Sequence, residues 1–337
     1  MNLEERKNAL VELGHRLSFS LDIYTIAQKA KIINPWFSVD STNAAIAAII
    51  ENFLNLDKLN EWLSKYSIKE TAQKKIGLIL AGNIPLVGFH DIISVFLSGH
   101  KSIIKLSEKD SVLTKFIFSE LFKVNPKTEK YFQFEERLKE YDAVIATGSD
   151  STGKYFEKYF KNVPSIIRKN RHGVAVVTSS NSKEQIQALG NDIFKYFGLG
   201  CRNVSKVYLK KGLKVDFILD ELESYKEVAN HNKYKNNYDY TYALYLMNSV
   251  EFFTNDFLIM KPDSNIVSRI ATLHYEHFDD LNLLEEHLIE NQEKIQCVVG
   301  DVRFKNIRTL PFGESQRPAL WDYADGVDTL DFLIKLK

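Results

Sequence analysis

The feature that most constrains this chain is a regular alternation of short apolar runs with amphipathic stretches, which begins at Lys75. The runs IGLIL (76–80), SIIKL (102–106) and DAVIAT (142–147) are separated by stretches of helical periodicity. Runs that are apolar throughout have no solvated face, so they are typical of strands in a parallel sheet covered by helices on both sides. The pattern predicts a doubly wound α/β fold that contains a dinucleotide-binding domain.

Changes in this pattern divide the 337 residues into four segments. Residues 1–70 show helical periodicity with little strand signal and are predicted to form a helical N-terminal segment. We assign 71–176 to the dinucleotide-binding domain and 177–325 to a second α/β domain, the catalytic one. Within the second domain, the tyrosine-rich segment 230–242 is expected to be a surface loop, with His231, Tyr234, Asn237 and Tyr238 as candidates for contact with substrate. The last segment, 326–337, contains LDFLIKL and is predicted to be a C-terminal strand.

The composition excludes several classes of protein. Lys and Arg number 44 and so do Asp and Glu, so the formal net charge is zero and the chain has no global attraction for nucleic acid or anionic membrane. A hydrophobic fraction of 45% argues against disorder. No apolar run approaches the ~18 residues of a membrane span, and the charged N-terminus is unlike a signal peptide. We therefore expect a soluble, cytoplasmic protein without integral membrane contact and without nucleic-acid partners.

The two cysteines, Cys201 and Cys297, cannot form a disulfide framework. Cys201 follows Gly198-Leu199-Gly200 in a corner between a predicted helix and a predicted strand. At this position the cysteine could be a reactive thiol or a structural residue, and the sequence leaves both interpretations open. The carboxyl end of that helix would raise the pKa of the thiol, so activation requires Arg202, another cation or a cofactor. Cys297, inside IQCVVG, is expected to be a buried strand residue. We assign no metal site.

Polar residues follow two of the predicted strands directly. Asn83 lies in AGNIP after the first run, and Lys105, Ser107 and Glu108 end the second. Such residues commonly form turns, but side chains at the carboxyl ends of parallel strands also lie where these folds bind ligands. The second group is the candidate contact for an adenosine ribose.

A glycine-containing turn follows the third run. The stretch Gly148 to Lys154 fits the phosphate-loop pattern G-x-x-x-x-G-K, but Tyr155 stands where that loop needs Ser or Thr for magnesium. We therefore disfavour an ATP-binding loop. Backbone N–H groups of Gly148 and Ser149 before a helix would instead suit a dinucleotide pyrophosphate.

Taken together, these motifs resemble the aldehyde dehydrogenase superfamily, and more closely its LuxC-like fatty acyl-CoA reductase branch. AGNIPL is similar to the superfamily's strand-end Asn-x-Pro, SGHKSIIKLSE to A-G-N-x-x-x-x-K-P-S-E, and ATGSDSTG to T-G-S-x-x-x-G. GLGC is similar to G-Q-x-C and PFGES to the carboxyl-terminal P-F-G. The five motifs occur in the family's order, from 81 to 315.

The resemblance implies a role for each matching position. It makes Cys201 the nucleophile and Asn83 the side-chain donor of an oxyanion hole. The cofactor-binding positions that it implies are Lys105, Ser107 and Glu108 at the adenosine ribose, Gly148 and Ser149 at the pyrophosphate, and Phe312 near the nicotinamide.

One departure from the family indicates the reaction. Ordinary aldehyde dehydrogenases carry E-L-G-G-K, whose Glu activates water against the acyl-enzyme, whereas here 167–171 read IRKNR with no carboxylate. Exchange with a thiol such as coenzyme A then becomes the natural partner reaction. The cations Arg168, Lys169 and Arg171 most simply form a solvated face, with cofactor or coenzyme A phosphates as the other reading.

The resemblance thus implies an acyl-CoA reductase that makes an aldehyde with NADPH, NADH being possible, and a homodimer through the C-terminal strand. The alternatives are an NAD(P)-dependent aldehyde dehydrogenase, an acyl-phosphate reductase, or a non-catalytic cofactor-binding scaffold.

Overall fold

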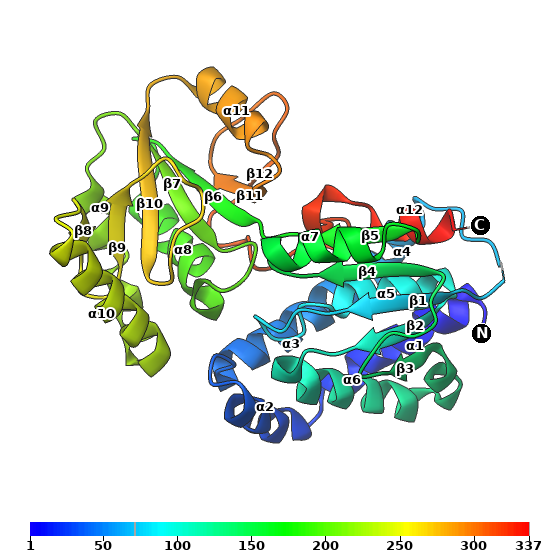
Figure 1. The fold of residues 1–337 in the computed structure, drawn as a ribbon. Helices are drawn as coiled ribbons and strands as arrows, with labels where there is room; N and C mark the ends of the chain where they lie inside the picture. The colour runs from blue at the N-terminus through cyan, green and yellow to red at the C-terminus, as the bar shows by residue number, and fades with distance from the viewer. Residues whose placement is uncertain (71, 337) are drawn as a thin grey trace. The chain divides into compact units, whose positions relative to one another are not determined.

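The computed structural model describes residues 1–70 and 72–336, which form two compact units (Figure 1). Unit 1 comprises 1–170 together with the segment from 318 onward, and unit 2 comprises 171–317. The chain therefore leaves unit 1 after Asn170 and returns to it at Pro318. The sequence placed the boundary near 176, and the return of the chain to unit 1 was not foreseen.

Unit 1 begins with the expected helices: α1 (Leu3–Ser18), α2 (Asp22–Ile33), α3 (Val39–Phe53) and α4 (Leu56–Leu63). In α1, the Asn2 side chain accepts the N–H of Glu5, whose carboxylate accepts the Asn2 N–H in return. This capping box satisfies N–H groups that a helix start leaves without partners. Leu10, Leu13 and Leu17 then recur at three- and four-residue intervals and are buried in the core.

The sheet of unit 1 contains only parallel strands. Its order is β3-β2-β1-β4-β5, formed by β1 (Lys75–Ile79), β2 (Lys101–Lys105), β3 (Phe132–Phe134), β4 (Ala143–Thr147) and β5 (Ser165–Arg168). The main helices between them are α5 (Phe89–Ser98), α6 (Ser111–Val124) and α7 (Asp150–Tyr159), with 3-10 turns η1 (Glu108–Asp110) and η2 (Pro126–Tyr131).

Both faces of this sheet are buried, as the uniformly apolar runs predict. Along β4, Ala143 and Ile145 join the cluster that contains residues of α5 and α6, while Val144 and Ala146 pack with Phe160 on the opposite face. Successive strand residues point to opposite faces, so a strand covered on both sides must be apolar throughout. The doubly wound parallel sheet is confirmed.

The carboxyl-terminal segment is helical, so the predicted strand in 326–337 is wrong. The 3-10 turn η5 (Ala324–Gly326) leads to α12 (Thr329–Ile334), which belongs to unit 1. Asp328 accepts the Asp331 N–H and caps the helix. Leu330 and Leu333 are both fully buried at a three-residue spacing, so tertiary packing selected the helical over the extended conformation.

Unit 2 contains a larger sheet in the order β12-β11-β6-β7-β10-β9-β8, parallel except for the edge pair β8–β9. Its strands are β6 (His172–Val177), β7 (Val204–Lys210), β8 (Phe253–Thr254), β9 (Ile259–Pro262), β10 (Thr272–Phe278), β11 (Ile295–Gly300) and β12 (Thr309–Leu310). Its helices are α8 (Lys183–Phe194), α9 (Val215–Glu221), α10 (Asn232–Met247) and α11 (Leu281–Glu290), with 3-10 turns η3 (Lys195–Gly198) and η4 (Glu223–Asn230).

The segment expected to be a loop at 230–242 is mostly α10. The His231 Nδ1 accepts the Tyr234 N–H at the helix start (3.4 Å). Tyr234, Tyr238 and Tyr245 share one buried face, and the Tyr234 hydroxyl donates to the Phe257 carbonyl oxygen (3.1 Å). The tyrosines therefore form a helix face of core residues, a periodicity that the intervening Asn and Lys residues obscure.

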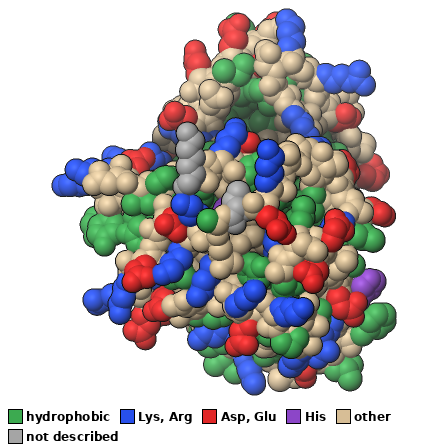
Figure 2. Space-filling model, turned by 90° about the vertical axis from the view of Figure 1, so that its right-hand side faces the viewer, with side chains coloured by type: hydrophobic (Ala, Val, Ile, Leu, Met, Phe, Trp, Pro, Cys, Tyr) green, Lys and Arg blue, Asp and Glu red, His purple; other side chains and the backbone are tan. Residues whose placement is uncertain are grey.

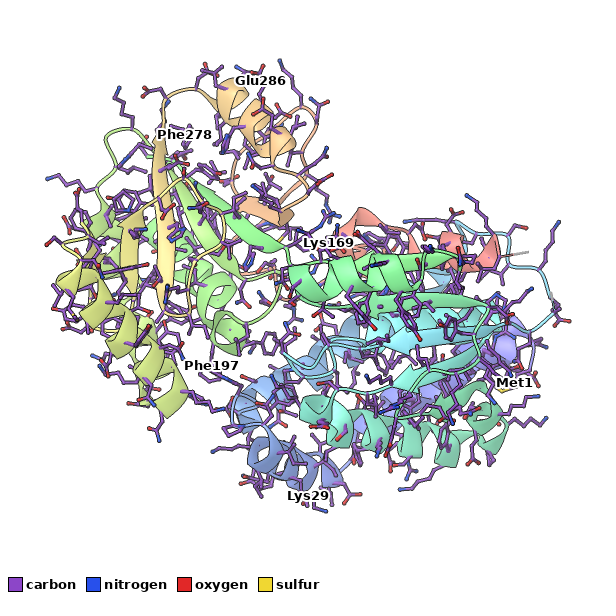
Figure 3. All side chains as sticks on the ribbon, in the orientation of Figure 1. Met1, Lys29, Lys169, Phe197, Phe278 and Glu286 are labelled. Atoms are coloured by element: carbon purple, nitrogen blue, oxygen red, sulfur yellow. The ribbon has the colours of Figure 1, made fainter. Side chains whose placement is uncertain are left out.

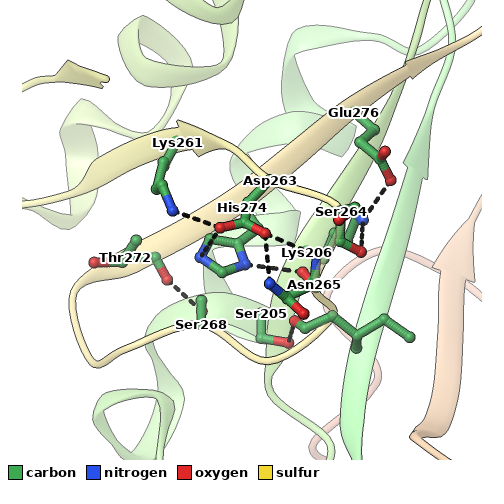
Figure 4. Close-up of polar contacts among 11 residues, drawn as sticks. Ser205, Lys206, Lys261, Asp263, Ser264, Asn265, Ser268, Thr272, His274 and Glu276 are labelled. Carbon is green, nitrogen blue, oxygen red and sulfur yellow. Dashed lines mark hydrogen bonds and ion pairs between the residues drawn. The ribbon is translucent and has the colours of Figure 1, made fainter. Parts of the chain in front are cut away.

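A polar cluster around the buried side chains of Lys206 and His274 fixes the loop between β9 and β10 to the sheet of unit 2 (Figure 4). The Lys206 side chain, 0% exposed, donates to the Ser264 carbonyl oxygen (2.7 Å) and pairs with Glu276 (2.5 Å). Asp263 pairs with Lys261 (2.5 Å), and His274 Nδ1 lies 2.8 Å from the Asn265 carbonyl oxygen. Burial is the main cause that lowers the pKa of His274. The cluster satisfies charges that would otherwise be costly to bury.

Two surface properties bear on possible partners. Figure 2 shows cationic and anionic side chains interspersed over the face in view, in keeping with the zero net charge. Within 1–70 and 72–336, no helix is both long and apolar enough to cross a bilayer.

Candidate functional site

The carboxyl ends of the unit 1 strands bring six of the predicted site residues to one edge of the sheet. Asn83 follows β1, Lys105, Ser107 and Glu108 end or follow β2, and Gly148 and Ser149 follow β4. In the sheet, β1 lies between β2 and β4, so chain connections leave in opposite directions on its two sides. A doubly wound sheet binds ligands in the crevice that such a reversal creates. The roles of these residues stay predictions.

The loops after β1 and β2 pack directly on each other. A Cβ atom added at Gly82 would lie 2.4 Å from the Ser107 Oγ, so only glycine permits this approach. The Leu80 N–H donates to the Lys105 carbonyl oxygen (3.2 Å). Asn83 and Lys105 themselves are exposed. The contacts hold the Asn83 loop beside the predicted ribose-binding residues.

Asp110 is a residue of this edge that sequence reasoning missed. Its Oδ2 accepts the Leu86 N–H (2.9 Å), at a residue whose φ of 57° lies in the left-handed region. Burial raises the pKa of Asp110 to about 8, against the opposing effect of that hydrogen bond. The sequence offered only an acidic residue before a helix, which is a common capping pattern and says nothing about burial.

The turn at Gly148 leads straight into a helix. The Gly148 N–H donates to the Arg168 carbonyl oxygen (3.2 Å), and the Ser149 Oγ accepts the Thr152 N–H (3.4 Å) as the N-cap of α7. Gly153 and Lys154 lie inside α7, so no extended glycine loop wraps a phosphate here. No phosphate loop forms here, and because the Gly148 N–H already donates to the Arg168 carbonyl oxygen, a pyrophosphate at the N-terminus of α7 stays a prediction.

Cys201 lies in unit 2, in a four-residue turn between η3 and β7. The Asn203 N–H donates to the Gly200 carbonyl oxygen (3.1 Å), which closes the turn around Cys201 and Arg202. Cys201 is half-buried. Just before it, Tyr196 and Phe197 have φ values of 53° and 58°, in a left-handed region that side chains other than glycine seldom adopt. Strained backbone of this kind clusters at functional sites.

Residues of α10 approach the same region. The ring of Phe197, which is labelled in Figure 3, is the common partner. Its centroid lies 4.2 Å from that of His231 and 6.4 Å from that of Tyr234. His231 therefore contacts the segment that leads to Cys201, although the predicted loop is a helix. Cys297 is a strand residue as expected, but it is half-buried, and its thiol lies 3.8 Å from the Arg202 carbonyl oxygen.

Phe312 is buried in the loop that follows β12, and this loop is anchored on α8. The Asp192 carboxylate accepts the N–H groups of Gly313 (2.6 Å) and Ser315 (2.9 Å). Asp192 is fully buried, and burial is the main cause that raises its pKa. Unit 2 thus holds the loops of Cys201 and Phe312 at the end of one helix, and sequence reasoning missed the Asp192 that anchors the second.

Within the cationic run at 168–171, Lys169 is exposed as expected, but Arg168 does not lie on a solvated face. The Arg168 guanidinium pairs with Asp91 (2.6 Å) and donates to the Ala324 carbonyl oxygen (2.6 Å) and the Thr329 Oγ1 (2.9 Å). Arg168 is only 4% exposed, so it does not serve as a contact for cofactor or coenzyme A phosphates. Its role is to hold the carboxyl-terminal segment on unit 1.

A groove of about 840 Å³ also lies in unit 1, but at the amino ends of the strands. It is on the edge of the sheet opposite the predicted cofactor crevice. Its lining includes two lysines, three aspartates and apolar residues of α12: Lys74, Asp142, Pro164, Val327, Asp328, Asp331, Phe332, Lys335 and Leu336.

Comparison with known proteins places these observations in context. The profile of the family described as acyl-CoA reductase (LuxC) matches residues 6–230. A long-chain acyl-protein thioester reductase from Aliivibrio fischeri is 27% identical over 184 residues, which is 49% of this chain and 38% of the relative. The chain thus matches well under half of that relative's length.

Solved structures share the fold. Aldehyde dehydrogenase 21 from Physcomitrella patens, in complex with succinate, has a TM-score of 0.73 at 12% identity. The match covers 99% of this chain and 84% of the Physcomitrella chain. A glyceraldehyde-3-phosphate dehydrogenase from Methanocaldococcus jannaschii, complexed with NADP, has a TM-score of 0.67 at 12% identity, with coverages of 91% and 77%. The fold is that of the aldehyde dehydrogenases.

Proposed function

The chain belongs to the LuxC family of acyl-CoA reductases, and on that premise we propose that it reduces an acyl thioester to an aldehyde through a thioester on Cys201. The matched residues 6–230 include Cys201, Asn83 and every proposed cofactor contact except Phe312. This match, joined to the absence of a carboxylate from 167–171, is the observation that carries the proposal.

Each step follows from a residue of the chain. The Cys201 thiolate attacks the acyl carbonyl carbon, while the Asn83 amide and the Cys201 backbone N–H donate to the oxyanion. The thiol group that carried the acyl chain, from coenzyme A or a protein, leaves as a thiolate and takes up a proton from solvent. NADPH supplies hydride to the acyl carbon when it is bound. Hydride addition leaves the thiohemiacetal as its alkoxide, which collapses to the aldehyde and returns Cys201 as a thiolate.

The region around 167–171 supports reduction over hydrolysis. Its cations are engaged with protein groups: Arg168 with Asp91, and Lys169 with Glu157 (2.7 Å). Without a carboxylate base in this stretch, water attacks the acyl-enzyme poorly, and the thioester survives long enough to be reduced. A water-activating aldehyde dehydrogenase is therefore the less favoured function.

The carrier of the acyl group is coenzyme A or a protein. The family description and the sequence resemblance favour acyl-CoA, whereas the Aliivibrio relative is named an acyl-protein thioester reductase. Both are thioesters, so the attack by Cys201 is the same. We propose acyl-CoA as the donor to test first and acyl-protein as the second.

For the cofactor we propose NADPH, with NADH as the competitor. Lys105 is exposed at the end of β2 and suits a 2′-phosphate, whereas Glu108, also exposed, favours the free ribose hydroxyls of NADH. A homodimer stays a prediction, but the C-terminal strand that suggested it is a helix.

The deciding experiment incubates the protein with a panel of acyl-CoAs and acyl-proteins, follows oxidation of NADPH and NADH, and traps the acylated residue by mass spectrometry. We expect the acyl group on Cys201 and no turnover by Cys201→Ser, with Cys297→Ser as the matched control. Cys201→Ser activity within a few-fold of wild type would exclude the covalent route.

A further inference from the structure

The carboxyl end of α8 bears an arrangement of polar groups that the reaction scheme does not use. A helix leaves its last four carbonyl groups without intrahelical partners. The Asn203 side-chain amide donates to the carbonyl oxygens of Asp192 (3.0 Å), Ile193 (3.2 Å) and Lys195 (2.8 Å). Asn203 is 2% exposed, and its side chain therefore closes the end of α8 from a position nine residues beyond the helix.

The Asn203 side chain is also hydrogen-bonded to the turn that contains Cys201. Its Oδ1 accepts the Gly200 N–H (2.8 Å), while the Asn203 N–H donates to the Gly200 carbonyl oxygen. The Asn203 carbonyl oxygen accepts the Gly173 N–H of β6 (2.8 Å). Cys201 thus lies in a turn whose two ends are tied to each other, to the end of α8 and to the sheet.

Asp192 connects this arrangement to a second loop. Its backbone carbonyl accepts from Asn203, and its carboxylate accepts from Gly313 and Ser315 in the loop that contains Phe312. A Cβ added at Gly313, where φ is 88°, would lie 3.3 Å from the Ala188 carbonyl oxygen of α8. The close approach of this loop to α8 is therefore specific to glycine.

We propose that Asn203 and Asp192 are positioning residues, which fix the Cys201 turn and the Phe312 loop on the common frame of α8. This inference rests on the proposed function for the roles of Cys201 and Phe312. Asn203 acts on the thiol through the turn, and Asp192 acts on the cofactor through the Phe312 loop. A displacement of a reacting group by about 1 Å typically costs on the order of 100-fold in rate, so the fixing of these loops bears directly on turnover.

A merely structural asparagine would not move the reactivity of one thiol, and the test uses that difference. In Asn203→Ala we expect the rate of Cys201 alkylation by iodoacetamide, followed by mass spectrometry across pH, to shift its midpoint by about half a pH unit or more. We expect kcat to fall about tenfold or more while KM for acyl-CoA stays within about threefold.

Asn181→Ala is the matched control, because Asn181 lies at the opposite end of α8. It is also buried, its Oδ1 accepts the Thr178 N–H (2.7 Å), and it belongs to the same unit. We expect this control to lose stability without moving the alkylation profile. If Asn203→Ala does not fold, Asn203→Ser, which keeps a shorter donor and acceptor, carries the same readouts.

Asp192→Asn tests the other half of the frame. It keeps the backbone carbonyl that binds Asn203 but places an amide N–H₂ against one of the two loop N–H donors. We expect weaker NADPH binding, about fivefold or more by fluorescence titration, with the Cys201 alkylation profile unchanged. Folded Asn203 and Asp192 variants that match Asn181→Ala in both readouts would overturn the inference.

The alkylation and titration readouts do not need turnover. A shifted profile in a protein that reduces no acyl thioester would therefore reject the proposed function and leave the positioning intact. If the wild type reduces acyl thioesters but the variants show unshifted alkylation profiles and unchanged NADPH binding, the proposed function stands and the positioning role is rejected.

Discussion

At the scale of single residues, the candidate site contains one exposed and one buried polar side chain on the same loop system. Asn83 is exposed on the loop after β1, whereas Asp110 is buried beneath the same loop and bonds its backbone at Leu86. We propose that Asn83 contacts the substrate, whereas Asp110 holds the loop from inside. Substitutions at the two positions should therefore separate catalysis from stability.

Asn83→Ala should lower kcat with little change in KM. Loss of one oxyanion donor typically costs about 3–4 kcal/mol of transition-state stabilisation, or roughly 10²- to 10³-fold in rate. Steady-state kinetics with the best acyl thioester measure the effect, and Asn162→Ala, at an exposed position of the same unit, is the control. A fall confined to KM would mean that Asn83 binds substrate and does not stabilise the oxyanion.

Asp110→Asn should stabilise the protein, and more so at higher pH. An Asp pKa raised to about 8 in the folded state lies above the unfolded value, so the folded state retains a proton that the unfolded state has lost. The Asp110 carboxyl therefore contributes a loss of stability as pH rises from about 4 to about 8, which Asp110→Asn removes. The Asn oxygen still accepts the Leu86 N–H but cannot ionise. Urea unfolding at pH 5 and pH 8 should show a smaller loss for the variant than for wild type or the exposed control Asp57→Asn.

At the scale of elements, the helices and strands that the sequence predicted are those whose burial is uniform. The middle residues of β1, β2 and β4 are buried on both sides, because helices cover both faces of the sheet. The loop predicted at 230–242 and the strand predicted in 326–337 are instead the helices α10 and α12, whose local sequence does not indicate a helix. Tyrosine has an intrinsic preference for strands, and the apolar pattern of LDFLIKL fits either a strand or a helix. Packing against the core of each unit therefore determines that both segments are helical. Asp192 and Asn203 were missed because the loop that Asp192 binds begins more than 100 residues later in the chain.

Arg168→Met tests how α12 is held. The guanidinium links Asp91 of α5 to Thr329 of α12 in a buried environment, and its removal leaves the Asp91 charge without that partner. Breaking a buried pair in this way typically costs about 3–5 kcal/mol. Lys169→Met, whose pair with Glu157 is half-exposed, should cost no more than about 1 kcal/mol. Chemical unfolding compares the two, and equal costs would show that the carboxyl-terminal segment does not depend on Arg168.

At the scale of the whole molecule, each unit contains a buried histidine whose pKa burial lowers: His100 in unit 1 and His274 in unit 2. The His100 Nδ1 accepts the Lys74 N–H (3.2 Å), and its Nε2 lies 3.2 Å from the Leu333 carbonyl oxygen of α12. Protonation would break the first of these hydrogen bonds.

Both units should therefore lose stability on acidification. A lowered folded pKa means that the unfolded histidine takes up a proton first, so this stability is present above about pH 6.5 and is lost as pH falls below it. Thermal unfolding followed between pH 7 and pH 5 should show the midpoint of the double variant His100→Gln/His274→Gln rising relative to that of wild type as the pH falls. An unchanged slope in that variant would assign the acid sensitivity to other groups.

The return of the chain to unit 1 at Pro318 has a consequence for synthesis on the ribosome. Unit 2 is contiguous in sequence and is complete once Arg317 has emerged, whereas unit 1 lacks α12 until residues 329–334 have also emerged. Until then, Arg168 and His100 have no carboxyl-terminal partners, and the leucines that α12 inserts into the core are missing. A nascent chain is thus expected to complete its second unit before its first, although the first unit begins earlier in the sequence.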